Sequence, residues 1–192
     1  FEEAYGLEAG PEWFERARLA ALRIPGCSAS FVSPAGLVVT NHHCVRGAVS
    51  RVSEPGEGLL DAGFYASRLG DERRIPDYHA DQLVAVEDVT DEVYAAVDAA
   101  PLEERARARE RVLADARERL TAEHGGDDPV RVEIVGLYNG GRYSAYVFRR
   151  FTDVRLVAAV ELQTGFFGGD PDNFTYPRYA LDFAFLRVYD DE

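Results

Sequence analysis

Short apolar runs separated by turn residues recur along this chain of 192 residues. In residues 130–134, valine and isoleucine alternate with arginine and glutamate, which is the pattern of a strand with one buried face. Residues 28–32 and 37–40 flank the turn sequence Ser-Pro-Ala-Gly, and Asn139-Gly140-Gly141 supplies a second hairpin turn. Runs this short and this rich in turns favour an antiparallel sheet over a parallel one. The remaining strands that we expect cover residues 82–89, 143–151, 154–160 and 183–189.

Two segments have helical character. Residues 11–22 begin at a proline, carry a tryptophan and two leucines on one apolar face, and precede a Pro-Gly pair that ends the helix. Residues 90–124 are rich in Ala, Glu, Arg and Leu and are closed by two glycines. Segment 54–81 is rich in Gly, Pro, Asp and Glu, so we expect a loop with little regular structure there. The sequence therefore predicts a mainly β fold with a helical insertion at about 90–124.

The charge balance excludes one class of function. The chain has 34 carboxylates against 21 basic residues, a net charge of −13, and nucleic-acid binding that follows the phosphates needs clustered positive charge. No apolar run approaches the ~18–20 residues that span a bilayer. The chain has no methionine, and its first residues are not those of a signal peptide, so we expect a processed chain or a piece of a longer reading frame.

The pentapeptide Thr40-Asn41-His42-His43-Cys44 follows an expected strand. A histidine there can act as a general base, because its ordinary pKa near 6.5 lets it accept and return a proton near neutral pH. Two alternatives stay open at this point. The histidines and the cysteine could bind a metal, although the sequence has no further Cys/His cluster to complete four ligands, or the pair could be purely structural.

The two cysteines, Cys27 and Cys44, are 17 residues apart, and we expect them on the two arms of the predicted hairpin. Across an antiparallel pair they could approach within disulfide range, and a bridge would contribute roughly 3 kcal/mol. A disulfide implies an oxidising compartment. The alternative is two reduced, buried cysteines.

Two long blocks carry a resemblance to a known family. Residues 27–44, CSASFVSPAGLVVTNHHC, resemble the catalytic-histidine region of serine peptidases with the chymotrypsin fold. The doubled histidine after Thr-Asn is similar to that of the bacterial dipeptidyl peptidases 7 and 11, which release N-terminal dipeptides. Residues 166–183, FFGGDPDNFTYPRYALDF, resemble the block of that family that ends in the triad aspartate. Weaker similarity runs through residues 61–65 and 153–157.

The resemblance implies roles for particular residues. His43 matches the general base, and Asp182 matches the carboxylate that orients it. Asn173 matches the residue that binds the free α-amine of the substrate, and Phe174 lines that end of the site. In this fold the base directly precedes a cysteine bridged back across the hairpin, so the resemblance favours the Cys27–Cys44 disulfide. It implies neither a metal nor an organic cofactor.

The sequence departs from the family pattern in the second block. Phe174 stands where the family usually has tryptophan. Leu181 replaces a small residue directly before Asp182, and a larger side chain there could shift how this carboxylate approaches His43. Asp170 and Asp172 also invite a calcium interpretation, but the further oxygen donors of a regular calcium loop are missing.

A triad also needs a nucleophile, and no serine of this chain lies in a Gly-x-Ser-Gly sequence. In the family the serine follows the aspartate by several hundred residues, so we expect the chain alone to be inactive as a peptidase. The seven serines are Ser28, Ser30, Ser33, Ser50, Ser53, Ser67 and Ser144.

The resemblance implies a chymotrypsin-like antiparallel β-barrel, the first barrel of a double-barrel peptidase. Residues 1–25 would be a helical segment packing on it. Residues 26–192 would form the N-terminal part of the catalytic domain, with the helical domain and the serine-bearing barrel outside this chain. The expected function is a bacterial periplasmic or secreted serine dipeptidyl aminopeptidase. Its expected partners are peptides with a free N-terminus and a second subunit of a homodimer. The alternative is a non-catalytic β-barrel binding module that kept the fold and lost the chemistry.

Overall fold

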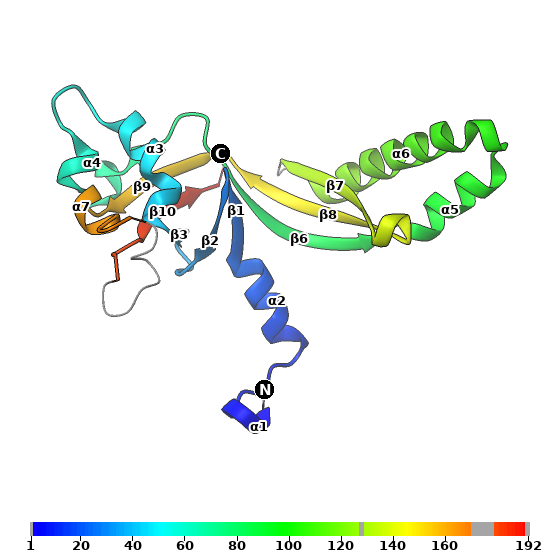
Figure 1. Ribbon diagram of the computed structural model, residues 1–192, viewed down its shortest axis with the longest axis horizontal. Helices are drawn as coiled ribbons and strands as arrows, with labels where there is room; N and C mark the ends of the chain where they lie inside the picture. The colour runs from blue at the N-terminus through cyan, green and yellow to red at the C-terminus, as the bar shows by residue number, and fades with distance from the viewer. Residues whose placement is uncertain (1, 127–128, 170–178, 191–192) are drawn as a thin grey trace. The chain divides into compact units, whose positions relative to one another are not determined.

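The computed structural model describes residues 2–126, 129–169 and 179–190, which divide into two compact units (Figure 1). Unit 1 combines residues 1–81 with residues 151–192, and unit 2 consists of residues 82–150. The helices expected as an insertion belong to unit 2, together with strands that come before and after them in the sequence.

Unit 1 is built on an antiparallel sheet, in which β10 lies between β9 and β3 (Figure 1). The strand order is β4-β9-β10-β3-β2-β1, and β5 also pairs with β9. The mainly β, antiparallel fold expected from the sequence is confirmed. The bounds are β1 Ala21–Ile24, β2 Cys27–Phe31, β3 Leu37–Thr40, β4 Phe64–Tyr65, β5 Arg73–Arg74, β9 Asp153–Ala159 and β10 Ala184–Tyr189.

The hairpin of β2 and β3 depends on Gly36. Its φ of +72° lies in the left-handed region, and a Cβ there would lie 2.4 Å from the carbonyl oxygen of Val188. The carbonyl of Gly36 in turn accepts a hydrogen bond of 3.0 Å from the N–H of Val188. The predicted turn therefore also ties the hairpin to the end of β10.

The helices of unit 1 differ from the sequence-based expectation in three ways. The first long helix ends at Ala20, because residues 21–24 pair with β2 and bury Leu22 in the core instead of on a helix face. Residues 54–81, expected as a loop, contain short helices and strands. The helices α3 and α7 were not predicted. The bounds are α1 Glu2–Tyr5, α2 Pro11–Ala20, α3 His42–Val52, α4 Leu59–Ala62, η1 Leu69–Asp71 and α7 Leu162–Gly165.

The core of unit 1 lies between the sheet and α3. Val45 and Val49 of α3 are fully buried with Leu156 of β9 and Leu186 of β10. This packing fixes the helix that begins at the paired histidines.

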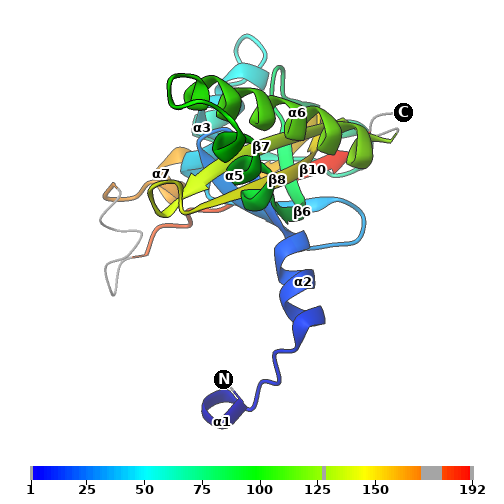
Figure 2. The ribbon, with the colours of Figure 1, turned by 90° about the vertical axis from the view of Figure 1, so that its right-hand side faces the viewer.

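Unit 2 packs two helices on a short sheet of order β6-β8-β7, and α6 contacts both α5 and β7 (Figure 2). Its core contains Leu120, Val132 and Val147. The helix expected over 90–124 is interrupted at residues 100–104, because the residue before Pro101 is extended, with a ψ of 143°. The bounds are β6 Ala80–Asp88, α5 Thr90–Ala99, η2 Leu102–Glu104, α6 Arg105–Gly125, β7 Val130–Leu137, η3 Tyr138–Gly140 and β8 Arg142–Phe151.

In the parts of the chain that the structure describes, no helix has both the length and the apolar character needed to cross a bilayer.

Cys27 and Cys44 are joined by a disulfide, with their Cα atoms 5.9 Å apart. Cys27 begins β2, but Cys44 lies beyond the hairpin arm, in the first turn of α3. The prediction that Cys44 lies on the second arm of the hairpin was therefore wrong, because Cys44 lies in the helix that follows that arm. The bond ties the start of α3 covalently to the sheet.

Replacing both cysteines with alanine should lower the free energy of unfolding by about 3 kcal/mol, because the 17-residue loop gains freedom in the unfolded chain. Urea unfolding of the chain with and without a reductant measures this difference. The reduced wild-type chain should match the double variant. A reduced chain as stable as the oxidised one would contradict the prediction.

Candidate active site

Strand pairing brings His43 and Asp182 together across 139 residues of sequence. His43 lies in the first turn of α3, directly after β3, and Asp182 lies two residues before β10. Because β3 and β10 are antiparallel with Thr40 opposite Ala184, the end of one strand lies beside the start of the other. The two sequence-predicted residues therefore meet at one edge of the sheet.

The carboxylate of Asp182 contacts His43 twice. Its Oδ2 lies 2.7 Å from Nδ1 of the ring, and its Oδ1 accepts the backbone N–H of His43 at 2.9 Å. Asn41 adds a third anchor, since its Nδ2 donates to the backbone oxygen of Asp182 at 3.1 Å and to Oδ2 at 3.2 Å. These contacts fix both the carboxylate and the ring that it faces.

This geometry assigns the protons of the ring. With Nδ1 donating to the carboxylate, the neutral ring of His43 keeps its lone pair on Nε2. The side chain of Asp182 is only 8% exposed, whereas that of His43 is 41% exposed. A buried carboxylate behind an accessible imidazole is the arrangement of a general base with its orienting partner.

Leu181 does not disturb this pair. Its side chain is half exposed, and its N–H donates to the carbonyl of Thr164 at 3.0 Å. The larger residue before Asp182 is thus accommodated by pointing outward, and the approach of the carboxylate to His43 stays within hydrogen-bond range.

His42 has a different environment from its neighbour. It is 1% exposed, and neither ring nitrogen has a hydrogen-bond partner among the described residues. Burial lowers the pKa of His42, and the nearby Arg46 and His43 lower it further. Asp182 and the backbone of Val160 favour the protonated ring, but Val160 does not make hydrogen-bond geometry with either nitrogen. His42 is therefore held neutral. The sequence indicated His43 as the base and gave no role to His42.

Among the described residues, two clusters have side chains of the types that bind metals in other proteins. The first consists of Cys27, His43 and Cys44, but the disulfide occupies both sulfur atoms. The second, in unit 2, consists of Glu87, Glu123 and His124. There Nε2 of His124 lies 2.7 Å from Oε1 of Glu87, and Arg119 pairs with Glu123 at 3.1 Å. The side chains of the second cluster are therefore already engaged in ion pairs.

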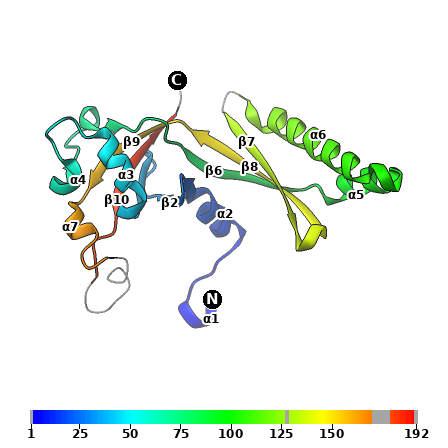
Figure 3. The same cartoon turned by 45° about the horizontal axis from the view of Figure 1, so that its top comes forward.

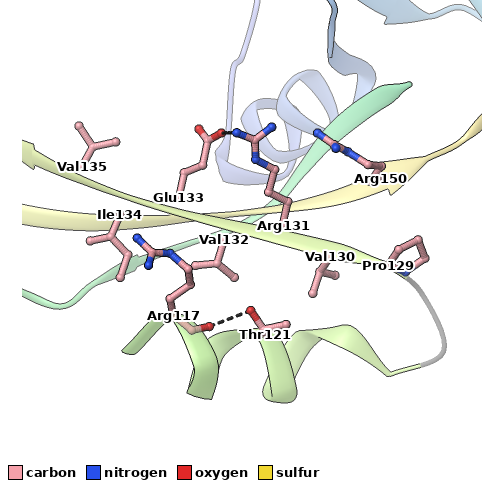
Figure 4. Close-up of a pocket in the computed structure, with 10 residues that line it drawn as sticks. All are labelled: Arg117, Thr121, Pro129, Val130, Arg131, Val132, Glu133, Ile134, Val135 and Arg150. Carbon is pink, nitrogen blue, oxygen red and sulfur yellow. Dashed lines mark hydrogen bonds and ion pairs between the residues drawn. The ribbon is translucent and has the colours of Figure 1, made fainter. Parts of the chain in front are cut away.

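A groove of about 760 Å³ in unit 2 is lined by residues of α6, of β7 and of the end of β8 (Figure 4). Arg117, Arg131 and Arg150 line it, and Arg131 pairs with Glu133 at 2.8 Å. Its polar side chains can bind anionic groups, but they include neither a histidine nor a nucleophile beside one. The candidate active site is therefore the pair in unit 1.

Asn173 and Phe174 lie outside the described residues. All seven serines lie within them, and no serine hydroxyl of the described chain is hydrogen-bonded to His43. The described residues thus bring a histidine and a carboxylate together, with no serine hydroxyl bonded to the histidine.

Comparison with known proteins gives a consistent family. The family model described as Peptidase S46 matches residues 1–192. The chain is 34% identical over 167 residues to dipeptidyl-peptidase 7 of Capnocytophaga gingivalis. It is 33% identical over 168 residues to the Asp/Glu-specific dipeptidyl-peptidase of the same organism. Each alignment covers 87% of this chain and 23% of the relative.

The crystal structure of Porphyromonas endodontalis DPP11 in complex with the dipeptide Arg-Glu is similar to this chain, with a TM-score of 0.76 and 29% identity. The match covers 91% of this chain and 26% of that structure. The likeness supports the barrel-like antiparallel fold expected from the sequence.

The burial of neutral His42 predicts an acid-sensitive component of stability. Its pKa is lower in the folded chain than the ordinary 6.5 of the unfolded chain, so its contribution is complete above pH 6.5 and is lost as pH falls toward the folded pKa. Between pH 7.5 and 5, wild type should therefore lose more free energy of unfolding than a His42→Phe variant. Urea unfolding at each pH measures the difference. Equal losses in the two proteins would show that His42 is not the group responsible.

Proposed function

The chain belongs to the peptidase S46 family, and we propose that it supplies the general base and the orienting carboxylate of a serine-type dipeptidyl aminopeptidase. The observation that carries this proposal is the contact of 2.7 Å between Nδ1 of His43 and Oδ2 of Asp182, in a His43 side chain that is 41% exposed. The proposal places the serine outside residues 1–192, since no serine of this chain bonds to His43 among the described residues and the chain spans 23% of the length of these relatives.

The proposed reaction is acyl transfer through a serine ester. Nε2 of His43 takes the proton of the serine hydroxyl as its oxygen attacks the scissile carbonyl. Asp182 stabilises the imidazolium that forms, and the imidazolium then gives its proton to the departing amine. Water attacks the ester with the same base, which frees the dipeptide and restores the serine. No step needs a metal or an organic cofactor.

Release of a dipeptide requires that the free N-terminus be recognised. We assign this role to Asn173, whose side-chain oxygen can accept a hydrogen bond from the substrate ammonium without a buried counter-charge. Phe174 would line the same end of the site. The relatives' names include both dipeptidyl-peptidase 7 and an Asp/Glu-specific enzyme at nearly equal identity. The proposed substrate class is therefore peptides with a free N-terminus.

The disulfide between Cys27 and Cys44 favours an oxidising compartment as the place of this activity. Cysteine pairs persist in oxidising surroundings such as the bacterial periplasm or the exterior. We therefore propose a periplasmic or secreted enzyme. That the full-length protein works as a homodimer is proposed from the family resemblance alone.

Asp182→Asn tests the proposal in the full reading frame that contains this chain. The amide keeps the shape of the carboxylate but cannot hold the same ring tautomer or stabilise the imidazolium, so kcat for dipeptide release should fall about 10⁴-fold. Initial rates on a fluorogenic dipeptide substrate measure the loss. Asp115→Asn, an exposed carboxylate of α6, is the matched control and should leave the rate unchanged.

Two results would contradict the proposal. A full-length protein without dipeptidyl release would favour the binding module. An Asp182→Asn variant that retained wild-type activity would show that the pair does not serve catalysis.

A further inference from the structure

The ring of His42 lies where any side chain on residue 165 would be, and residue 165 is a glycine. Its ring packs against Gly165, the last residue of α7, and a Cβ on Gly165 would lie 2.8 Å from both Cγ and Nδ1 of the ring. This distance is shorter than an ordinary contact between carbon atoms. The ring of His42 therefore fits at this position only because Gly165 has no side chain. Figure 3 shows the two helices that carry them, α3 and α7, in unit 1.

The contact between His42 and Gly165 belongs to a closed path through the active pair. Residue Thr164, next to Gly165, accepts the N–H of Leu181 at 3.0 Å. Asp182 follows Leu181 and accepts the N–H of His43 at 2.9 Å, and His43 follows His42. Each member of the pair is thus one peptide bond from a residue that contacts α7: His43 follows His42, and Asp182 follows Leu181.

A second contact joins the same two elements. The guanidinium of Arg46, one turn after His42, lies over the ring of Phe166 at 4.9 Å from its centroid. Phe166 directly follows Gly165. Because this contact lies beside the first, α3 and α7 are held at two adjacent points.

The ring of His42 acts here by its shape. Its nitrogens have no hydrogen-bond partner among the described residues, and the surroundings keep it neutral. A buried polar group without partners destabilises a fold by about 1–3 kcal/mol, so a purely structural core position would favour an aliphatic side chain. What the ring supplies is a flat, rigid body against a residue without a side chain.

From these contacts we propose that His42 is a positioning residue, whose ring packs against Gly165 and thereby holds His43 and Asp182 at hydrogen-bonding distance. It does not touch the reacting atoms. The inference rests on the proposed function for its catalytic meaning, but the geometry that it predicts exists without substrate.

The test compares size changes on the two sides of the contact in this chain. Gly165→Ala adds a methyl group against the ring, and His42→Ala removes the ring. Each should lower the thermal midpoint by about 3–10 °C and should weaken or abolish the downfield proton resonance of Nδ1–H in His43. The double variant should recover most of what Gly165→Ala loses, because the methyl group then enters the space that the ring has left.

Val49→Ala is the control for a merely structural effect. Val49 is fully buried in the same helix but lies outside this path. It should lower the thermal midpoint and leave the His43 resonance in place. A Gly165→Ala chain that keeps this resonance while losing stability would overturn the proposal. So would a double variant no better than Gly165→Ala.

The outcome stays informative if Gly165→Ala does not fold. A folded double variant would then establish the size complementarity by itself, whereas an unfolded double variant beside a folded His42→Ala would refute it. All readouts are independent of peptide hydrolysis. A failure of dipeptide release would therefore count against the proposed function and leave this inference standing.

Discussion

The antiparallel pairing of β3 with β10 is the constraint on which the active pair depends. It places the segment that follows β3 beside the segment that precedes β10, and so brings together a histidine and a carboxylate that are 139 residues apart in the sequence. The contact is then reinforced by the backbone. Because Asp182 accepts both the ring and the main-chain N–H of His43, the orientation of the carboxylate is set by α3 as well as by the sheet.

Three further features keep that helix in place. The disulfide ties its first turn to β2, its apolar face is buried against β9 and β10, and its paired histidine packs on α7. The two adjacent histidines therefore have different environments. Successive residues of a helix point in different directions, so His42 enters the core while His43 remains accessible. Burial lowers the pKa of the His42 imidazole, and the free energy of unfolding should therefore fall at acid pH.

The sequence allowed the hairpin, most long strands and the active pair to be predicted. Alternation and turn residues identify strands because they reflect the two faces of a sheet, and the family motifs identified His43 and Asp182. The whole of β1 was missed, since residues 21–22 continue a helical pattern and only pairing with β2 makes residues 21–24 a strand. Pro101 could have marked the break between α5 and α6. The role of His42 could not be predicted, because the space that it fills is defined by Gly165, which is 123 residues away and has no side chain to mark the contact.

The central claim is that His43 activates a serine that lies outside residues 1–192. Labelling of the full-length protein with a fluorophosphonate, followed by mass spectrometry of the labelled peptide, tests it most directly. The account predicts one labelled serine outside this segment, with labelling lost in His43→Ala. Labelling of any of the seven serines within the segment, or labelling that persists without His43, would contradict it.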